Sequence, residues 1–461
     1  MPFSPFVIER TSRLPVSAQA AYDWHARPGA FARLTPPWEK VTVLDRSGDL
    51  ADARAVLRVF AGPVPLRWVA RHRDAVAGRQ FVDEQVAGPF TRWVHLHRFD
   101  PEGPAQCMMT DRVEFVPPWG GLGAAAAPVI RSRVERLLDY RHALLPADLE
   151  THAKFAGRPA LHIAVTGSTG LLGRSLVPFL TSGGHRITRV VRGKPDVHQV
   201  GWDPAAGRID VAGLEGVDAV VHLAGENVGA RWSAARMREI RGSRVRGTRL
   251  LCEALGRLRD PPRVLVSASA IGIYGNRGDD LLVESSPPSP QRDFLTDVGR
   301  EWEAATEAAQ AAGIRVVTLR FGIILTPGGG ALGRMLTPFR LGVGGPLGSG
   351  SQWMSWISID DAVGAVHHAL MTDDLEGPVN ATSPGPVVNR EFTATLGRVL
   401  RRPARIAVPA LALRLALGDL ADVGLLSSAR VIPEQLVASG YRFRHPGLEE
   451  ALRFVLGRER H

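Results

Sequence analysis

The sequence predicts two folding units, an α+β unit followed by a doubly wound α/β unit built on a parallel sheet. Over residues 1–150, short segments of alternating polarity are separated by Gly, Pro and Asp turns and end in one long helical segment. From Leu161 onward, apolar strand-like segments alternate with helical ones, as in a parallel sheet with helices on both faces. A glycine-rich string follows the first of these strands and marks the sheet edge where a ligand is expected.

The first unit, residues 1–150, has the pattern strand, helix, several antiparallel strands and a closing helix. An early helical segment is expected near 18–34. The closing helix is expected over about 125–145, where Val134, Leu138 and Leu145 recur at helical spacing. Residues 151–160 are expected to be a linker. The expected strands between the two helices are 41–44, 55–60, 66–72, 92–99 and 108–115.

The second unit repeats strand and helix. Its expected strands are 161–166, 186–191, 219–223, 263–267 and 315–320, and its expected helices are 171–182, 236–258 and 299–312. Asp360 and Asp361 follow an apolar stretch, and we expect them to cap a helix over 362–370. Residues 161–380 are expected to form the parallel-sheet domain, and residues 381–461 a small C-terminal lobe.

Composition bears on the class of protein. Hydrophobic residues make up 45% of the chain and mean hydropathy is near zero, which is typical of a globular protein rather than a disordered one. The net charge of +10 raises the question of nucleic-acid binding. The arginines are spread along the chain, and the densest run, 236–249, has helical spacing. We therefore expect a solvated helix face and no nucleic-acid partner; a phosphate-binding role for part of the run is the alternative.

The two cysteines, Cys107 and Cys252, lie in different expected domains. A disulfide framework and a cysteine-based metal site are therefore not expected, and a reducing cytoplasm is the expected setting. The start of the chain lacks a basic region followed by an apolar one, so no secretory signal is expected. The most apolar long stretch, 408–426, contains three charged residues, so no membrane span is expected either.

The string VTGSTGLLG joins the expected strand 161–166 to the expected helix 171–182. In this T-G-x-x-G-x-x-G pattern, the first glycine permits a tight turn, the second lets the backbone approach a pyrophosphate, and the third lets the helix pack on the strand. The amides and positive dipole end of the helix receive negative phosphates. The pattern predicts a Rossmann domain whose dinucleotide contacts Thr166, Gly167, Ser168, Thr169, Gly170, Leu171, Leu172 and Gly173.

The second expected strand bears on which dinucleotide binds. An NAD site carries an acid about 20 residues after the glycines, where it bonds the ribose 2′-hydroxyl. At that place the chain has Arg192 and no acid. A cation there suits the 2′-phosphate of NADP, so NADP(H) is the preferred cofactor and NAD(H) stays possible. Arg189 is a second candidate, Lys194 a less favoured one, and a merely solvated arginine is the alternative.

The segment His222-Leu-Ala-Gly ends the expected strand 219–223. Its small residues let the backbone pass over a dinucleotide. Leu223, Ala224 and Gly225 are therefore expected to contact the cofactor as well.

These motifs carry a resemblance to known families. The chain from Leu161 onward resembles the extended short-chain dehydrogenase/reductases, and more closely an atypical branch of epimerase-family proteins. The matching strings are VTGSTGLLG, HLAGENV, RWSAARMREIRGSR, SASAIGIYG, RVIPEQLVASGYRF and the long glycine-rich string over 319–361. Residues 1–150 resemble START-like helix-grip domains related to polyketide cyclases, through LTPPWEKVTV, GPFTRWVHLHRF and DRVEFVPPWGGLG. The resemblance implies a helix-grip domain, an NAD(P)-binding Rossmann domain and a small C-terminal substrate lobe.

Reductases of this superfamily generally use a serine and a Tyr-x-x-x-Lys pair. The serine orients the substrate carbonyl, the tyrosine transfers the proton, and the lysine lowers the pKa of the tyrosine. This chain departs from that pattern, because it contains no lysine after Lys194. Leu295 and Gly299 occupy the positions expected for the tyrosine and the lysine.

Three hydroxyl groups remain as catalytic candidates. Ser267 and Ser269 could bond a substrate carbonyl, and Tyr274 is the phenol available for proton transfer. A phenol with its ordinary pKa near 10 needs a nearby cation to act at neutral pH, and Arg320 or Arg244 could supply it. The alternative is that the serines only fill a strand end and that Tyr274 only packs beside the nicotinamide.

The string GGPLGSG over 344–350 lies where extended family members approach the substrate. Repeated glycines expose backbone amides, which suits an anionic or sugar-like ligand. Gly345, Gly348, Ser349 and Gln352 are therefore the candidate substrate-binding residues. A compact loop whose glycines only satisfy turn geometry is the alternative.

Helix-grip domains enclose an apolar cavity under the long helix, so an apolar ligand is a candidate partner of the first domain. Plain core packing is the alternative. His95 and His97 share a strand face, but no third ligand is evident in the sequence, so no metal site is expected. The residues expected to line the cavity are Trp38, Trp68, Trp93, His95, His97 and Trp119.

Two functions follow from these observations. The first is an NADP(H)-dependent oxidoreductase or epimerase-like enzyme that acts on a small carbonyl, alcohol or sugar-like substrate. The second is a catalytically inactive dinucleotide-binding protein that serves as a sensor or a partner-binding scaffold, which the missing Tyr-x-x-x-Lys pair favours. The oligomeric state stays open.

Overall fold

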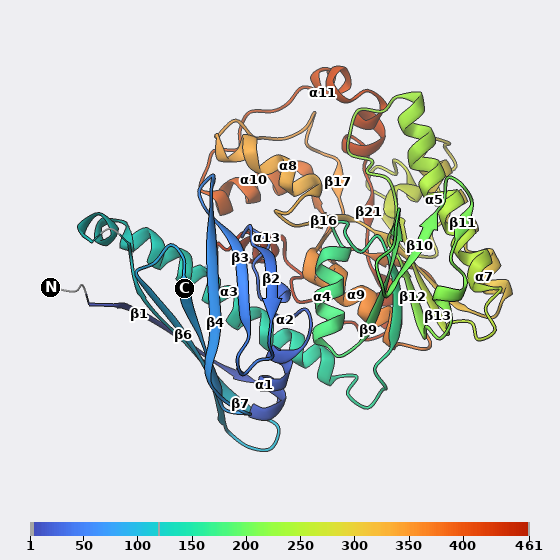
Figure 1. Cartoon of the computed structure of the whole chain (residues 1–461). Helices are drawn as coiled ribbons and strands as arrows, with labels where there is room; N and C mark the ends of the chain where they lie inside the picture. The colour runs from blue at the N-terminus through green and yellow to red at the C-terminus, as the bar shows by residue number, and fades with distance from the viewer. Residues whose placement is uncertain (1–3, 119, 460–461) are drawn as a thin grey trace. The chain divides into compact units, whose positions relative to one another are not determined.

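The computed structural model describes residues 4–118 and 120–459. The chain forms two compact units, which meet in sequence at Pro159 and Ala160. Each unit has its own sheet and its own apolar core. Figure 1 shows the antiparallel sheet and long helix of the first unit and the helix-covered parallel sheet of the second.

The first unit is built on a seven-stranded antiparallel sheet in the order β1-β7-β6-β5-β4-β3-β2. From β2 to β7 each strand pairs with the next, and β1 closes against β7. Gly62 turns the chain between β3 and β4 with φ 60°. The strands are β1 (Phe6–Leu14), β2 (Thr42–Ser47), β3 (Arg54–Ala61), β4 (Val64–Val76), β5 (Gln80–Ala87), β6 (Arg92–Pro101) and β7 (Cys107–Val116).

One long helix packs on this sheet. The helices of the first unit are α1 (Ala18–Ala26), α2 (Ala30–Arg33) and α3 (Gly121–Ala153). Val134 and Leu138 of α3 join a buried cluster with Val113 and Phe115 of β7. Further along α3, Leu145 belongs to a second cluster that includes α1. A long helix laid on an antiparallel sheet confirms the predicted α+β pattern and is the helix-grip arrangement that the resemblance implied.

Two helices of the first unit have other bounds than the sequence predicted, and one strand was not predicted. The expected helix 18–34 is divided in two, because Arg27 is extended before Pro28 and ends α1, and Gly29, with φ 91°, caps α2. Helix α3 continues to Ala153, so the expected linker 151–160 begins with helical residues. Strand β5 was not predicted, because the polar residues Asp83, Glu84 and Gln85 interrupt its apolar alternation.

The second unit has an eight-stranded sheet in the order β11-β10-β9-β8-β12-β13-β15-β19. All neighbours are parallel except β11, which is antiparallel to β10. The strand order reverses between β8 and β12, and open α/β sheets bind ligands at this switch point, beyond the carboxyl ends of the strands. The strands are β8 (His162–Thr166), β9 (Arg186–Arg192), β10 (Gln199–Asp203), β11 (Arg208–Ile209), β12 (Ala219–His222), β13 (Val264–Ala270), β15 (Arg315–Phe321) and β19 (Gly377–Ala381).

Helices connect these strands and build the C-terminal lobe. Three small two-stranded sheets add β14 (Leu281–Leu282) with β21 (Arg430–Val431), β16 (Ile323–Leu325) with β18 (Trp356–Ser358), and β17 (Trp353–Met354) with β20 (Val387–Val388). Across residues 4–118 and 120–459, every helix is too short or too polar to span a lipid bilayer. The helices are α4 (Gly173–Ser182), η1 (Ala212–Leu214), α5 (Ala234–Leu255), η2 (Ile271–Tyr274), α6 (Phe294–Ala304), α7 (Glu307–Ala311), α8 (Gly330–Arg340), α9 (Ile359–Met371), α10 (Asn389–Leu400), α11 (Ala410–Leu417), η3 (Ala421–Leu425), α12 (Glu434–Ala438) and α13 (Leu448–Val455).

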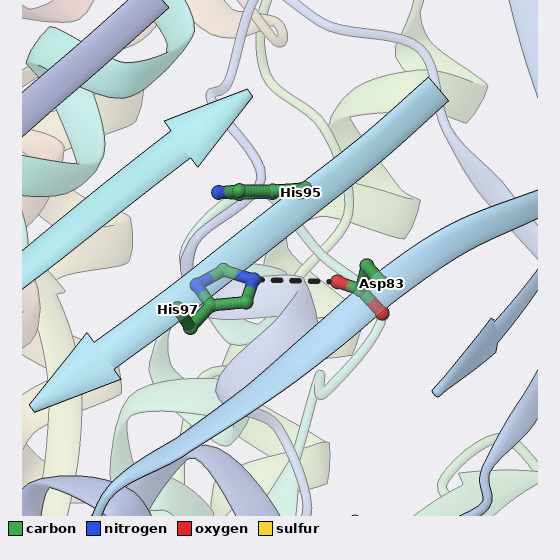
Figure 2. Close-up of side chains that lie close together, drawn as sticks. All are labelled: Asp83, His95 and His97. Carbon is green, nitrogen blue, oxygen red and sulfur yellow. Dashed lines mark hydrogen bonds and ion pairs between the residues drawn. The ribbon is translucent and has the colours of Figure 1, made fainter. Parts of the chain in front are cut away.

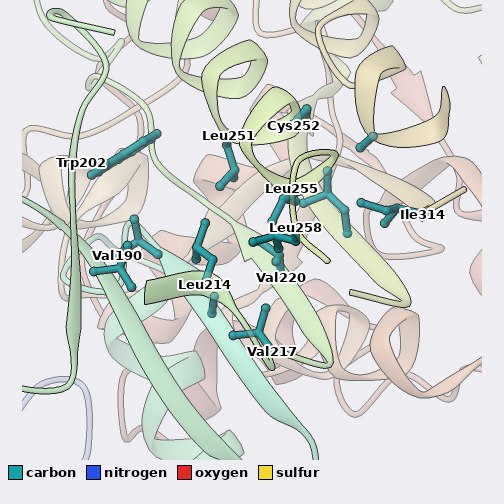
Figure 3. Close-up of a cluster of buried hydrophobic side chains, with 14 of the residues drawn as sticks. Val190, Trp202, Leu214, Val217, Val220, Leu251, Cys252, Leu255, Leu258 and Ile314 are labelled. Atoms are coloured by element: carbon teal, nitrogen blue, oxygen red, sulfur yellow. The ribbon is translucent and has the colours of Figure 1, made fainter. Parts of the chain in front are cut away.

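The main core of the second unit lies between α5 and one face of the parallel sheet (Figure 3). Leu251 and Leu255 are one helical turn apart on α5, and both are fully buried. They join Val190 of β9, Trp202 of β10 and Val220 of β12. This packing fixes the carboxyl ends of the central strands, where the site is expected.

Two details of the second unit correct the sequence prediction. The expected helix 299–312 is two helices, α6 and α7. Helix α9 begins before its expected start, and its cap is Ser358, whose Oγ accepts the amide of Asp361 at 3.0 Å. Asp361 instead accepts the amides of Arg444 at 2.7 Å and His445 at 3.1 Å. It therefore fastens the C-terminal segment rather than capping a helix.

Candidate functional site

The glycine-rich turn after β8 brings the carboxyl ends of β8 and β12 together. Gly167 has φ 66°, and a Cβ there would lie 2.7 Å from the carbonyl carbon of Leu223. A Cβ at Gly173, the first residue of α4, would lie 2.7 Å from Cα of Ser168 and would overlap the carbonyl oxygen of Gly167. Because real Cβ atoms essentially never come within 3.0 Å of such atoms, this conformation requires glycine at both positions.

The amino end of α4 carries unused hydrogen-bond donors. The amide of Gly170 donates to the carbonyl of Gly167 at 2.9 Å and closes the turn. Among the residues that the structure describes, the amides of Leu171 and Leu172 donate to no acceptor. Thr169 and Gly170 are exposed, so the turn is open to solvent. Free amides at the positive end of a ten-residue helix suit a diphosphate.

Thr166 lies beneath the turn and ties β8 to β12. Its Oγ1 accepts the amides of Leu223 at 3.1 Å and Ala224 at 3.2 Å, so its own proton goes to His222 Nδ1 at 2.8 Å. His222 Nε2 then donates to Thr248 Oγ1 of α5 at 2.9 Å. Burial lowers the pKa of His222 to about 4, which keeps the ring neutral. Thr166 is fully buried, and its hydroxyl makes all of its hydrogen bonds to groups of the protein.

Arg192 is the last residue of β9, the strand beside β8. Its side chain is exposed and forms no ion pair in the described part of the chain. Arg189 lies on the same strand but, three residues earlier, projects from the opposite face of the sheet. A dinucleotide bound on one face of the sheet can therefore meet only one of the two arginines.

A half-buried guanidinium lies against the backbone that follows β12. Arg244 of α5 donates from Nη1 to the carbonyl of Glu226 at 2.9 Å, and its Cζ lies 5.0 Å from the ring centroid of Trp302. A Cβ at Gly225 would lie 3.3 Å from that Cζ. Burial lowers the pKa of Arg244 to about 10, so the side chain stays charged at neutral pH. A cation therefore borders the segment 223–225.

Both candidate serines are buried at the carboxyl end of β13. Ser267 is 1% exposed, and its one hydrogen bond among the described residues is a long one, from Oγ to the carbonyl of Ala268 at 3.4 Å. Ser269 is 3% exposed, and its Oγ donates to Glu303 Oε1 of α6 at 2.7 Å. The exposed residue at this strand end is Ala270, which has no hydroxyl. The placement favours the alternative in which these serines complete the strand end.

Tyr274 of η2 is fully buried in a polar network. Its hydroxyl accepts from Arg320 Nη1 at 2.8 Å and donates to Asn380 Oδ1 at 2.9 Å. Arg320 also donates from Nε and Nη2 to the two carboxylate oxygens of Glu303, at 2.8 and 2.7 Å. Burial raises the pKa of Tyr274, although Arg320 opposes the rise. The cation expected near Tyr274 is therefore Arg320, but the phenol has no exposed surface and its placement favours a packing role.

The two positions expected for a tyrosine and a lysine pack against η2. A Cβ on Gly272 would lie 3.4 Å from Leu295 Cβ, and a Cβ on Gly299 would lie 3.0 Å from Ile273 Cβ. Any long side chain at Gly299 would have to displace η2. The close packing of α6 on η2 therefore leaves no space at position 299 for the lysine of a Tyr-x-x-x-Lys pair.

The glycine-rich loop over 344–350 packs inside the C-terminal lobe. A Cβ at Gly345 would overlap the backbone of Ile406, and the amide of Gly348 donates to the carbonyl of Val408 at 2.9 Å. Gln352 is buried and donates from Nε2 to two backbone carbonyls, at 3.2 and 3.1 Å. Ser349 is exposed. These contacts favour the compact-loop alternative for all but Ser349.

The first unit encloses a cavity of about 510 Å³, lined by residues of the sheet and of α3. Trp68, Trp93, His95 and His97 line it, as the sequence led us to expect, and Leu57 is among its many apolar neighbours. The volume and the mainly apolar walls are typical of a small-molecule site.

One of the expected lining residues differs from the prediction, and one is not described by the structure. Among the described residues, Trp38 is not part of the cavity wall; it packs edge-on against Tyr140, with ring centroids 5.1 Å apart. The reason is that Trp38 lies in the turn after α2, where it reaches the side of α3 instead. Trp119 lies outside the described residues.

One part of the cavity wall is polar and was not predicted from the sequence. It consists of Asp83, His95 and His97 and is called the polar floor below. Asp83 of β5 pairs directly with His95 of β6 across the sheet, and His97 shares their face (Figure 2). Ligand atoms of these three residues all lie within 4.8 Å of one another. The expectation that no third ligand accompanies the histidines is therefore wrong, because the β5–β6 register supplies Asp83.

The electrostatics of this floor are strongly coupled. Burial lowers the pKa of His95 to about 4. Burial acts in the same direction on His97, but Asp111 of β7 and Asp83 raise the pKa of His97 to about 9. The pKa of each carboxyl group is held well below its usual range by the neighbouring histidines, despite burial.

Sequence reasoning missed residues that act through distant contacts. Glu303, Asn380 and Asp111 lie far along the chain from the groups they bond, and no local motif marks them. A charged residue at an inward position of a strand, as Asp83 is, was the one available signal. It could be read only once β5 was recognised.

Family models match three parts of the chain. Residues 163–381 match the model described as NAD dependent epimerase/dehydratase family. Residues 14–140 match the model described as Polyketide cyclase / dehydrase and lipid transport. Residues 408–455 match a model described as Domain of unknown function (DUF1731).

Relatives and solved structures agree with these matches. Epimerase family protein Mb2239 of Mycobacterium bovis is 41% identical over 298 residues, which are 64% of this chain and 98% of that protein. The nucleoside-diphosphate sugar epimerase from Corynebacterium glutamicum has a crystal structure that is 32% identical with a TM-score of 0.80, covering 98% of this chain and 90% of that one. Human epimerase family protein SDR39U1 (isoform 2), solved with NADPH, is 36% identical with a TM-score of 0.59, covering 64% and 99%. The chain therefore belongs to the NAD dependent epimerase/dehydratase family and carries a polyketide-cyclase-like helix-grip domain ahead of its Rossmann domain.

Proposed function

We propose that the α/β unit binds NADP(H) at the carboxyl ends of β8, β9 and β12. The protein would then act as an NADP(H)-dependent oxidoreductase or epimerase-like enzyme on a small carbonyl, alcohol or sugar-like substrate. The observation that carries this proposal is the turn 167–173, where the amides of Leu171 and Leu172 have no acceptor among the described residues and Thr169 and Gly170 are exposed. The NADPH in the human family member supports the same class of cofactor.

Each residue of the site has a role in this proposal. The amides of Leu171 and Leu172 hold the diphosphate, and Gly170 leaves space for it. Arg192 pairs with the 2′-phosphate, and Arg244 adds a second positive charge beside the segment 223–225. When bound, the dinucleotide supplies or accepts a hydride.

The buried polar network is proposed to position the site rather than to react. Ser269 and Arg320 both bond Glu303, and Tyr274 bonds Arg320. Together they hold the end of β13 and η2 against α6, at the sheet edge where the nicotinamide is expected. Domain bounds of 161–380 for the Rossmann domain and 381–461 for the substrate lobe remain part of this proposal.

Replacing Arg192 with alanine is expected to raise the Kd of NADPH by about tenfold to a hundredfold, because a charge-assisted pair contributes about 1.5–3 kcal/mol. The Kd of NADH is expected to stay unchanged, since NADH has no 2′-phosphate. Calorimetric titration measures both. Arg208→Ala, an exposed arginine on β11 of the same sheet, serves as the control. An equal loss for NADPH and NADH would remove Arg192 as the specificity residue.

A second candidate function is dinucleotide binding without turnover. It is favoured by the exposed Ala270 at the end of β13 and by the packing of Leu295 and Gly299, which leave no acid–base side chain of the usual pair. Consumption of NADPH against a broad panel of carbonyl compounds separates the two functions. Tight NADPH binding with no turnover on any compound would support a sensor or scaffold.

Tyr274→Phe and Ser269→Ala test the positioning role. Because neither hydroxyl is exposed, we expect kcat/KM to stay within about tenfold of the wild type, below the roughly 10²–10⁴-fold that general acid–base groups contribute. The free energy of unfolding is expected to fall by about 1–3 kcal/mol, because buried partners lose a hydrogen bond. A loss of kcat/KM beyond a hundredfold with unchanged stability would make Tyr274 a proton donor after all.

A further inference from the structure

The polar floor of the helix-grip cavity takes no part in the proposed dinucleotide chemistry. Asp83, His95 and His97 converge there from two neighbouring strands, and Figure 2 shows the Asp83 carboxylate facing the His97 ring. His97 Nε2 lies 3.4 Å from Asp83 Oδ2. Two ligands of one tetrahedral zinc ion, each about 2.0–2.1 Å from the metal, are separated by roughly the same distance.

We propose that Asp83, His95 and His97 bind one divalent transition-metal ion, with an open coordination position that faces the apolar cavity. Two imidazole nitrogens and one carboxylate oxygen suit zinc and ferrous iron better than magnesium or calcium. Three protein ligands with an open position are typical of reactive rather than structural metal sites. This site is independent of the dinucleotide site in the second unit.

An unsatisfied nitrogen points to a missing ligand. His95 is 4% exposed, and its Nε2 makes no hydrogen bond of good geometry in the described part of the chain; Asp111 Oδ1 lies 3.4 Å from it, beyond the usual hydrogen-bond range. A buried polar atom without a partner costs free energy, so such atoms are rare unless an ion or another ligand satisfies them. A metal ion at this point would satisfy it.

Outer residues already orient the ligands. His72 Nε2 lies 2.6 Å from Asp83 Oδ1, and Asp111 Oδ1 lies 2.6 Å from His97 Nδ1. A carboxylate on the far nitrogen of a metal-bound histidine fixes the ring and raises its basicity. These contacts leave Asp83 Oδ2 and His97 Nε2 turned toward each other, where the ion would lie.

The charges of the floor favour a divalent ion that also holds an anion. Asp83 and Asp111 contribute two negative charges, and Arg141 of α3, which lines the same cavity, contributes one positive charge. Metal binding requires neutral imidazoles, so His97 would give up the proton that it otherwise holds at neutral pH. These three charged groups then sum to one negative charge, and a divalent ion changes the sum to one positive charge. The open position therefore suits hydroxide or the carboxylate or enolate oxygen of a molecule whose apolar part fills the cavity.

Zinc titration of the chelator-treated full chain tests the proposal. We expect one tight zinc site per chain by calorimetry. His95→Gln and Asp83→Asn are each expected to raise the Kd of zinc by about a hundredfold or more. Loss of a residue that only hydrogen-bonds a metal ligand already weakens metal binding by about 10- to 100-fold, and loss of a ligand should weaken it at least as much. His198→Gln, an exposed histidine of the second unit, is the control and should bind as the wild type does. Elemental analysis of protein purified without added metal distinguishes zinc from iron.

The open position has its own test. The visible spectrum of the cobalt-substituted protein is expected to shift when octanoate is added, because its carboxylate would enter the first coordination shell. Circular dichroism and thermal unfolding establish whether both variants fold. If His95→Gln does not fold, zinc binding by Asp83→Asn and the metal content of the wild-type protein test the zinc site. The proposal is overturned by the absence of a tight site in the wild type, or by zinc binding that Asp83→Asn leaves unchanged. A spectrum that octanoate does not shift overturns the open position.

Discussion

Replacing Gly173 with valine is expected to raise the Kd of NADPH by more than about a hundredfold. The Cβ would lie 2.7 Å from Cα of Ser168 and would overlap the carbonyl of Gly167, so the turn itself must move. The amides of Leu171 and Leu172 then lose their alignment, and two charge-assisted hydrogen bonds contribute about 3 kcal/mol or more. Overpacking is also expected to lower the free energy of unfolding by about 1–3 kcal/mol. Calorimetry and urea denaturation measure the two effects.

Gly247→Ala is the matched control for this substitution. Gly247 lies inside α5, and a Cβ there would meet its nearest neighbour, Trp202, at 3.6 Å, an ordinary contact. We expect unchanged NADPH affinity and stability that is equal or higher by about 0.5–1 kcal/mol, because alanine favours a helix interior. NADPH binding by Gly173→Val at wild-type affinity would show that the turn is not the site.

Arg320→Met is expected to lower the free energy of unfolding by about 3–5 kcal/mol, the largest effect on stability that we predict. Arg320 is 5% exposed, holds both carboxylate oxygens of Glu303 and donates to Tyr274. Removing the cation leaves a largely buried carboxylate without its partner, which costs much more than the net stability of the pair. Urea denaturation followed by circular dichroism measures the change.

Two further variants show whether the effect arises from burial. Arg263→Ala removes an exposed ion pair, 3.7 Å from Asp218, and is expected to cost less than about 1 kcal/mol. Arg320→Met combined with Glu303→Gln is expected to recover part of the stability, because no lone charge stays buried. If Arg320→Met costs no more than Arg263→Ala, the network does not hold β13, η2 and α6 together.

The sequence could predict most of the fold because its signals are local. The turn 167–173 is recognisable from its glycines, and the conformation of Gly167 and Gly173 agrees with the roles assigned to them. Alternation of strand and helix depends on short-range periodicity, so the parallel sheet could be expected. Boundaries were less reliable: Arg27 and Pro28 end one helix and Gly29 caps the next, where periodicity predicts a single continuous helix.

The chemistry of the two sites was harder to predict, because it depends on contacts between distant segments. Both faces of β13 are buried, so alternation along the strand does not indicate whether Ser267 or Ser269 faces a ligand. Ser269 instead meets Glu303, which lies on another element. The Asp83–His95 pairing likewise depends on the register between β5 and β6, which no local pattern contains.

The most direct measurement is a calorimetric titration of the full chain with NADPH, with NADH and AMP in parallel. We expect NADPH to bind at one site per chain, more tightly than NADH by about tenfold or more, and AMP to bind weakly because it lacks the diphosphate. Absence of binding by either dinucleotide would contradict the assignment of the turn 167–173 as a diphosphate site, and the proposed enzymatic function with it.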